Sequence, residues 1–390
     1  MTQAITGPTS TRTPTASHEH RLPTLTGMRF AAAAAVFLCH FSLYIRGNGD
    51  FWRTLGEVGV SFFFVLSGFV LTWSTRPETT ARTFWRRRAA KVYPNHLVVA
   101  AAHAGLLLLT GKAIVAAQIL PTATLTQSWL PRFNLMTALS PVSWTLSCEV
   151  FFYLAFPLLV RQIRRMSTAT LWWVAGALVA TIFALPAIAL HFIPAGQPVA
   201  PLLPYLNNDT WFVGFFPLAR LLEFALGMTV ARIVAAGKWP QIGLLPATAL
   251  LALGYWMAME TLLCSFAAAT VVPIALVICA GAVADVEGRP SPLRHPYLIW
   301  LGEVSFALYL VHKPVIDYGA KLLGIPHFST MGLTEQVVVG IPMLIVSLLL
   351  AWLLHLAVER PAMRRWGRPR PASAGRHRGA CPHCGGRLAP

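Results

Sequence analysis

The sequence predicts an all-α, polytopic integral membrane protein: a bundle of about ten transmembrane helices with both termini in the cytoplasm. Of its 390 residues, 56% are hydrophobic and only 12% are charged, whereas soluble domains carry about 25% charged residues. Apolar runs close to the roughly 20 residues that span a bilayer recur along the chain. The loops between them are alternately rich and poor in basic residues, as cytoplasmic and external loops are.

The apolar runs lack the period-two alternation of barrel strands, so each is expected to form a helix. The sixth run is interrupted by Arg220 and Glu223 and has the weakest signal. In order, the ten runs cover 25–45, 59–75, 94–111, 142–160, 170–191, 213–233, 241–259, 263–284, 297–318 and 335–357.

The net charge of +17 has two possible meanings, nucleic-acid binding or membrane topology. Its distribution favours topology, because 23 of the 31 lysines and arginines fall in the two tails and in four alternate loops. Those loops lie near 76–91, 161–165, 232–238 and 289–294. We therefore predict a multi-pass protein of the cell membrane whose partner is the lipid bilayer and not a nucleic acid.

The domain organisation predicted is one membrane domain, residues 21–366, between a disordered tail, 1–20, and a basic cytoplasmic tail, 367–390. The C-terminal tail contains Cys381-Pro382-His383-Cys384, which looks like half of a zinc knuckle. A structural zinc ion needs four ligands, and this motif offers three at most. We therefore expect that the protein requires no metal. The alternative is a zinc knuckle shared between two chains.

Charged side chains inside a membrane cost about 2.5–3.5 kcal/mol each at the helix centre, so those that occur are candidates for function. Arg29 and His40 lie on the first predicted helix, eleven steps apart. That spacing places them about 20° apart on one face and roughly 16 Å apart along the axis. The alternatives are that Arg29 extends to the membrane surface and that His40 only packs.

The next two helices carry further candidates. Ser67 precedes Gly68 and offers a hydroxyl at mid-membrane, where packing alone is an equal explanation. Arg88 and Lys91 are three residues apart in a basic cluster, and Pro94 suits the first turn of the third helix. The cluster indicates either topology with anionic lipid binding or a clamp for phosphate groups.

Glu149, on the fourth helix, is predicted to lie at a depth similar to that of His40. A carboxylate at that depth can orient a histidine as a general base, although Arg220 and Lys313 are competing partners. Arg220 and Glu223 are three residues apart and can also satisfy each other. His312, on the ninth helix, is expected in the outer half of the membrane as a supporting residue or as a packing residue.

These motifs together resemble the acyltransferase-3 family of bacterial membrane O-acyltransferases. The resemblance extends from about Leu22 to Trp366 and rests on seven segments that occur in the family's order. They are LTGMRF (25–30) with His40, FFVLSGF (63–69), RRRAAKVYP (86–94), SWTLSCE (143–149) with Phe152-Tyr153, RLLEFALG (220–227), YLVH (309–312) and ERP (359–361).

The resemblance implies transfer of an acyl group from acyl-CoA to a hydroxyl-bearing acceptor. It makes His40, paired with Arg29 in the family's pattern, the essential catalytic residue, and it assigns CoA binding to Arg88 and Lys91. Their positions add two expectations: Glu149 as the partner of His40, and Arg29 beside the CoA phosphates at the inner surface. Lys91 stands where the family usually has a second arginine, Thr145 where serine is usual and Lys313 where an aromatic residue is common. Residues expected to contact substrate or to support the catalytic group are Ser67, Trp144, Arg220, Glu223 and His312.

For the acceptor, the resemblance favours a macrolide- or ansamycin-like natural product that receives an acetyl or other short acyl group. The alternative is a cell-envelope glycan or a lipid-linked sugar. A membrane transporter is the rival from another class, since charges at mid-membrane also mark substrate paths. In the enzyme hypothesis, His40 removes the proton of the acceptor hydroxyl or forms a covalent acyl-histidine.

Overall fold

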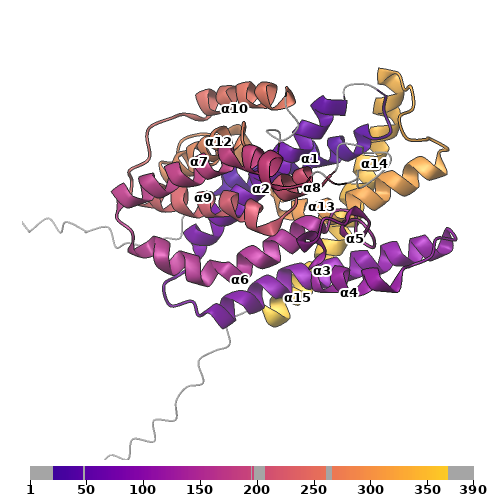
Figure 1. Ribbon diagram of the computed structural model, residues 1–390, viewed down its shortest axis with the longest axis horizontal. Helices are drawn as coiled ribbons and strands as arrows, with labels where there is room; N and C mark the ends of the chain where they lie inside the picture. Colours follow the sequence, from indigo (N-terminus) through magenta and orange to yellow (C-terminus); the bar gives the residue numbers. More distant parts are fainter. Residues whose placement is uncertain (1–20, 47–48, 195, 197–206, 261–265, 368–390) are drawn as a thin grey trace, which may run out of the picture.

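The computed structural model describes residues 21–46, 49–194, 196, 207–260 and 266–367, and their regular structure is helical (Figure 1). In these ranges, eight helices are long and apolar enough to cross a membrane, and two further apolar helices are shorter. Each of the ten predicted segments overlaps one of them. The predicted all-α membrane bundle is therefore confirmed. The cysteines at 381 and 384 lie outside the described residues.

The helices that match the predicted segments follow one another along the chain. They are α1 (Pro23–Ser42), α2 (Gly49–Ser74), α3 (Ala81–Leu109), α6 (Trp144–Arg165), α7 (Thr168–Phe192), α9 (Pro217–Ala235), α10 (Leu244–Met259), α12 (Val271–Val286), α13 (Pro296–Leu322) and α14 (Leu333–Leu354). Shorter helices connect or extend them: α4 (Ala116–Thr124), α5 (Phe133–Met136), α8 (Asn208–Gly214), the π-helical turn η3 (His355–Glu359) and α15 (Arg360–Trp366).

Two helices begin earlier than the hydropathy predicted. Helix α3 begins at Ala81, and the side chain of the preceding Thr80 accepts a hydrogen bond from the backbone N–H of Thr83 at 3.3 Å. Pro94 therefore lies inside α3 and not in its first turn. Helix α2 begins at Gly49, and its polar first turns include an ion pair between Arg53 and Glu57 at 3.0 Å. Hydropathy detects only the apolar part of such helices.

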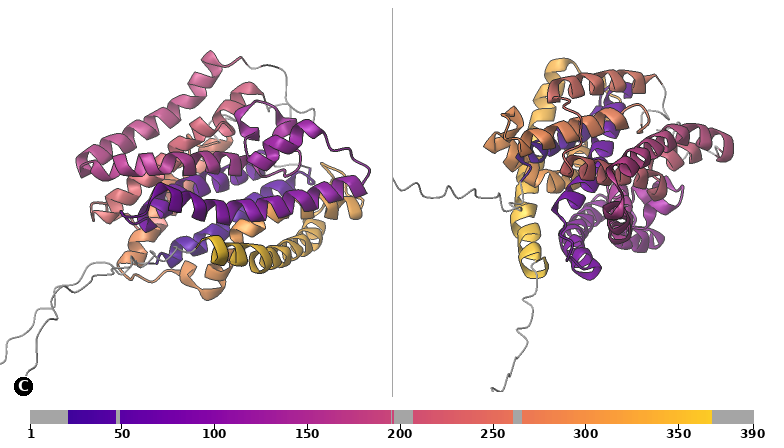
Figure 2. Two further views of the ribbon diagram at one scale, coloured as in Figure 1. Left: turned by 90° about the horizontal axis from the view of Figure 1, so that it is seen from below. Right: turned by 90° about the vertical axis from the view of Figure 1, so that its left-hand side faces the viewer.

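We call the end of the bundle that holds Pro23, Ala81 and Arg165 the inner end, because the basic loops predicted to be cytoplasmic lie there. The opposite end is the outer end, where α3 is followed by α4 (Figure 1). Helix α1 packs between α2 and α13, and α13 also packs against α14 (Figure 2). Helix α15 returns to pack against α3. This arrangement brings the C-terminal half of α1 against α13.

The centre of the bundle is the contact between α2 and α9. A Cβ atom on Gly68 would collide with the carbonyl oxygen of Phe224, and one on Gly227 would collide with that of Val65. The two backbones therefore touch at reciprocal glycines, as in other membrane helix pairs with small residues at the interface. This contact gives a packing role to one glycine in each of two sequence motifs.

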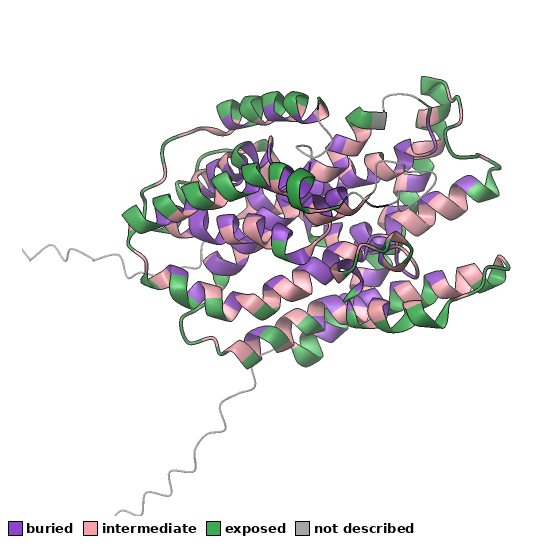
Figure 3. Ribbon diagram, in the orientation of Figure 1, coloured by how far each residue is buried: buried purple, intermediate pink, exposed green. Residues whose placement is uncertain are grey.

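The outward faces of the peripheral helices are apolar and exposed, whereas α2 and α9 are mostly buried (Figure 3). Trp173 on α7 is 82% exposed and Leu245 on α10 is 83% exposed. Soluble monomers rarely expose contiguous apolar surface on this scale. The protein is an integral membrane protein whose outer faces contact lipid.

Adding a methyl group at the α2–α9 contact should weaken the bundle. We expect Gly68→Ala or Gly227→Ala to lower the free energy of unfolding by about 1–3 kcal/mol, since overpacking forces the backbones apart. Gly105→Ala on α3 is the matched control, because nothing lies within 4 Å of an added Cβ there. Thermal denaturation in detergent, followed by size-exclusion chromatography, measures the effect. Equal midpoints for all three variants would contradict this packing.

Candidate active site

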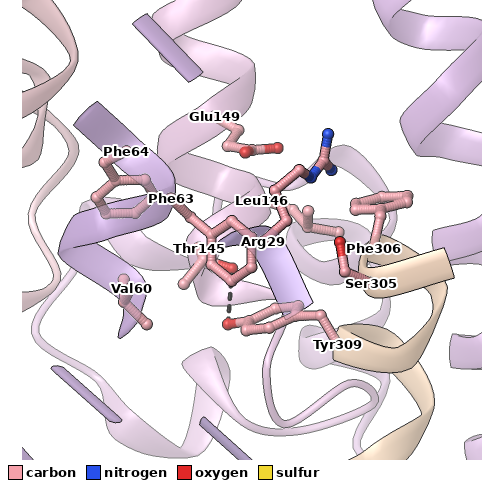
Figure 4. Close-up of a pocket in the computed structure, with 10 residues that line it drawn as sticks. All are labelled: Arg29, Val60, Phe63, Phe64, Thr145, Leu146, Glu149, Ser305, Phe306 and Tyr309. Atoms are coloured by element: carbon pink, nitrogen blue, oxygen red, sulfur yellow. Dashed lines mark hydrogen bonds between the residues drawn. The ribbon is translucent and has the colours of Figure 1, made fainter. Parts of the chain in front are cut away.

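Two cavities lie between the helices and share a wall. The inner cavity, about 50 Å³, is lined by Arg29, Phe63, Thr145, Glu149, Ser305 and other residues (Figure 4). The outer cavity, about 500 Å³, is lined by His40, Trp144, Arg220, Lys313 and a larger set of mostly apolar residues. Val60 and Tyr309 line both cavities. These two side chains separate the level of Arg29 from the level of His40.

His40 lies against His312, which α13 places opposite the last turn of α1. Nδ1 of His40 is 2.9 Å from Nε2 of His312, and their ring centroids are 5.0 Å apart. Each ring also approaches a carbonyl of its own helix. Nδ1 of His40 is 3.1 Å from the oxygen of Val36, and Nδ1 of His312 is 3.2 Å from that of Leu308. His312 is only 1% exposed, so its ring is held by packing as well.

This network assigns the tautomers of the two rings. A carbonyl oxygen only accepts hydrogen bonds, so Nδ1 of His312 donates its N–H to Leu308. In the neutral ring, Nε2 of His312 then accepts from the Nδ1–H of His40, which Val36 also approaches. The lone pair of His40 is therefore on Nε2. A histidine in this state can take a proton from a hydroxyl group.

The structure pairs His40 with His312 and not with Glu149, which corrects the pairing expected from depth. Glu149 accepts a hydrogen bond at 2.9 Å from the hydroxyl of Tyr153, one turn along α6. The sequence-based depth of Glu149 assumes that its helix begins at the membrane surface. In the structure, α6 begins deeper, inside the bundle. Trp144, its first residue, lines the outer cavity beside His40. Glu149 is thereby displaced inward to the inner cavity and Arg29 (Figure 4).

The basic residues predicted to bind CoA do come together near the inner end. Arg29 interacts electrostatically with Glu149, Glu359 and Arg88. Nζ of Lys91 lies 3.3 Å from a carboxylate oxygen of Glu359 in the π-helical turn. Nε of Arg29 is buried and has no hydrogen-bond partner among the described residues. Lys91 is thus neutralised by Glu359, whereas the guanidinium groups of Arg29 and Arg88 give the cluster its positive charge.

Arg220 and Glu223 form an ion pair at 3.1 Å, as the spacing on α9 indicated. Arg220 also donates hydrogen bonds to the carbonyl of Phe266 at 2.9 Å and to the hydroxyl of Ser61 at 3.1 Å. Its side chain is fixed between three elements while it lines the outer cavity. This pair is a packed structural unit, which removes Arg220 as a partner for Glu149.

The two remaining candidates belong to different levels of the molecule. Ser67 hydrogen-bonds with the hydroxyl of Tyr153 and so belongs to the group around Glu149. Trp144 packs edge-on against Phe215, with ring centroids 4.5 Å apart, in the wall of the outer cavity. Ser67 therefore lies toward the inner cavity and Trp144 lies in the wall of the outer cavity with His40.

Comparison with known proteins agrees with this geometry. A family model described as an acyltransferase domain, Acyl_transf_3, matches residues 22–354. The chain belongs to the acyltransferase-3 family. It is 40% identical to the acyltransferase MdmB of Streptomyces mycarofaciens over 90% of this chain and 94% of that protein. It is 27% identical to the exopolysaccharide production protein ExoZ of Rhizobium meliloti over 83% of this chain and 94% of that protein.

A third relative is nodulation protein 10 of Rhizobium leguminosarum bv. viciae, which is 26% identical over 86% of this chain and 91% of that protein. No solved structure matches the chain. The membership and the helices together make the protein an integral membrane acyltransferase.

Sequence reasoning missed one residue of this acyltransferase, Tyr309. Its hydroxyl accepts a hydrogen bond from Thr145 at 2.9 Å and donates one to the carbonyl of Val142 at 3.2 Å (Figure 4). Its ring centroid is 5.7 Å from that of His312. The spacing of three residues between Tyr309 and His312 placed both on one face of a helix, and this was the signal available in the sequence.

Removing the partner of His40 should slow the reaction without weakening donor binding. We expect His312→Ala to lower kcat on the order of 100-fold, because His40 loses the ring that orients it and that, with the carbonyl of Val36, accepts its Nδ1–H. KM for the acyl donor should stay near the wild-type value. His327→Ala is the control, since His327 is exposed and its ring contacts are with Tyr44 and Phe328 and not with His40 or His312. A His312→Ala enzyme with wild-type kcat would contradict this role.

Proposed function

We propose that this acyltransferase uses acyl-CoA to place an acetyl or other short acyl group on a hydroxyl of a macrolide- or ansamycin-like natural product. The observation that carries the proposal is the position of His40. Its ring lines a largely apolar outer cavity, directly beyond a narrow cavity that Arg29 lines. The cell membrane is the proposed location.

The donor side is supported by charge. Acyl-CoA is a multiply charged anion from the cytoplasm, so its phosphates should stay at the inner end. Arg29 and Arg88 lie there, and arginine forks match phosphate oxygens in geometry. With Lys91 paired to Glu359, these two arginines are the groups we assign to the diphosphate. The unpartnered Nε of Arg29 is consistent with a missing anionic ligand.

The path between donor and acceptor is supported by the inner cavity. Its walls are mostly apolar, with Phe63, Phe64 and Phe306 among them. The slender, uncharged pantetheine arm suits such walls, whereas the phosphates of CoA do not. To reach His40, the thioester must pass Val60 and Tyr309, the residues common to both cavities. We therefore assign to this pair the constriction that admits the acyl group.

The acceptor side is supported by the size and the lining of the outer cavity. Its volume of about 500 Å³ falls in the usual range for small-molecule sites. Aromatic side chains form part of its walls: Phe133, Trp144, Phe215, Phe266, Tyr309 and Phe328. Five charged side chains line it as well: Asp50, Arg53, Glu57, Arg220 and Lys313. The exposed surface of the cavity is still mostly apolar, which suits a macrocycle better than a glycan. The similarity to an acyltransferase of a Streptomyces species supports the same choice, and the weaker similarity to ExoZ supports a glycan as the second candidate.

The proposed reaction uses one nitrogen of His40. Nε2 takes the proton of the acceptor hydroxyl while its oxygen attacks the thioester carbonyl carbon. The new C–O bond forms, the C–S bond breaks, and the proton passes to the departing sulfur of CoA. His312 accepts the Nδ1–H throughout and so stabilises the transient imidazolium. If an acyl-histidine formed instead, labelled free CoA would exchange into acyl-CoA without acceptor.

Substitution of His40 tests the proposal. We expect membranes with His40→Ala to transfer labelled acetyl groups from acetyl-CoA to a macrolide or ansamycin acceptor at least about 100-fold more slowly than wild-type membranes, because the proposed general base is lost. An acceptor panel that includes glycans identifies the favoured class. His191→Ala, at the exposed end of α7, should keep wild-type activity. Turnover by His40→Ala at the wild-type rate would refute the proposal.

Widening the constriction should change which acyl groups pass. We expect Val60→Ala to raise the ratio of kcat/KM for butyryl-CoA to that for acetyl-CoA about 10-fold, the effect of one or two methylene groups in an apolar site. Val58→Ala is the matched control, because Val58 lies on the same helix but packs in the cluster around α12. If the ratio of butyryl-CoA to acetyl-CoA kcat/KM were the same in Val60→Ala, Val58→Ala and the wild type, Val60 would not select the acyl group.

A further inference from the structure

We propose that a third cavity at the inner end binds the adenosine 3′-phosphate part of acyl-CoA. This inference rests on the proposed function, in which acyl-CoA is the donor. The cavity, about 470 Å³, lies between the α2–α3 connection and the inner ends of α3 and α6. We call it the arginine pocket, and its lining includes Thr75, Thr79, Phe84, Arg161, Arg164 and Arg165.

The arginine pocket has the charge of an anion site. Three guanidinium groups from the last turns of α6 line it, and Arg232 adds a fourth positive charge within electrostatic range of Arg164. Glu78 is the carboxylate that faces Arg164 from the α2–α3 connection. Arg164 donates a hydrogen bond to the carbonyl of Thr75, which ties the two walls together. Arg161 and Arg165 remain exposed, with donors available for a phosphate.

The arginine pocket also lies next to the proposed donor site, to which a chain of side-chain contacts links it. Phe84 forms part of its wall, and the guanidinium carbon of Arg88 lies 5.8 Å from the centre of that ring. On the same side, the ring of Tyr153 is 6.3 Å from that of Phe84, and its hydroxyl bonds Glu149 in the inner cavity. The pocket, Arg88 and the inner cavity therefore succeed one another along α3 and α6.

This order matches the order of groups in the donor. With the thioester near His40 and the diphosphate at Arg29 and Arg88, the nucleotide must extend further toward the inner end. Its ribose carries a phosphate monoester, which arginine side chains bind well. An anionic lipid headgroup presents the same phosphate chemistry, so a test must separate the two sources.

The test compares acetyl-CoA with acetyl-3′-dephospho-CoA in purified protein reconstituted into vesicles. One set of vesicles contains phosphatidylcholine alone, and the other also contains phosphatidylglycerol. We expect wild-type kcat/KM to favour acetyl-CoA by at least about 10-fold, the effect of charged hydrogen bonds to one phosphate. Arg161→Gln/Arg165→Gln should bring the ratio near one by raising KM for acetyl-CoA alone. Arg289→Gln, an exposed inner-end control, should keep the wild-type ratio.

Three outcomes would overturn the inference. The wild type could have equal kcat/KM for the two donors, or the double variant could lower kcat/KM for both donors equally. The third is a ratio of the two kcat/KM values that changes with phosphatidylglycerol. If the double variant fails to fold, inhibition of the wild-type enzyme by nucleotide fragments of CoA tests the assignment instead. Adenosine 3′,5′-bisphosphate should compete with acetyl-CoA more strongly than 5′-AMP does, and equal inhibition would overturn the assignment. A wild type that uses neither donor contradicts the proposed function itself, whereas equal use of both contradicts only the arginine pocket.

Discussion

The hydrogen bond between His40 and His312 is the interaction on which the site depends. It joins two helices, so its length is set by how closely α1 and α13 approach. Gly302 on α13 has no room for a Cβ atom against the carbonyl of Thr26 on α1, so the two backbones touch near the inner end. From that contact outward, both helices run to the histidines. The state of the His40 ring is thus a product of helix packing.

The second constraint is the separation of charge from apolar surface. A buried cation in a membrane is tolerated when it has partners or stays near water. Arg29, Arg88 and Lys91 meet this condition through Glu149 and Glu359 near the inner end. The surface of the outer cavity is mostly apolar, although Arg220 and Lys313 also line it. A donor that is charged at one end and apolar along its arm can use both environments in a single bound state.

Much of the fold and part of the site could be predicted from the sequence. Apolar runs located the helices because the bilayer requires them, but the polar first turns of α2 and α3 gave no such signal. Positions on one helix, such as Arg29 with His40, follow from helical periodicity. Contacts between helices also depend on how far each helix is displaced along the membrane normal. An error of this kind placed Glu149 beside His40, where the structure has His312.

In the proposed mechanism, the donor reaches His40 from the inner end, through the constriction at Val60 and Tyr309. The most direct measurement compares transfer from labelled acetyl-CoA, which does not cross membranes, in sealed vesicles of opposite orientation. Inside-out vesicles should be fully active without detergent, and right-side-out vesicles should be inactive until they are permeabilised. Full activity of intact right-side-out vesicles would contradict the claim.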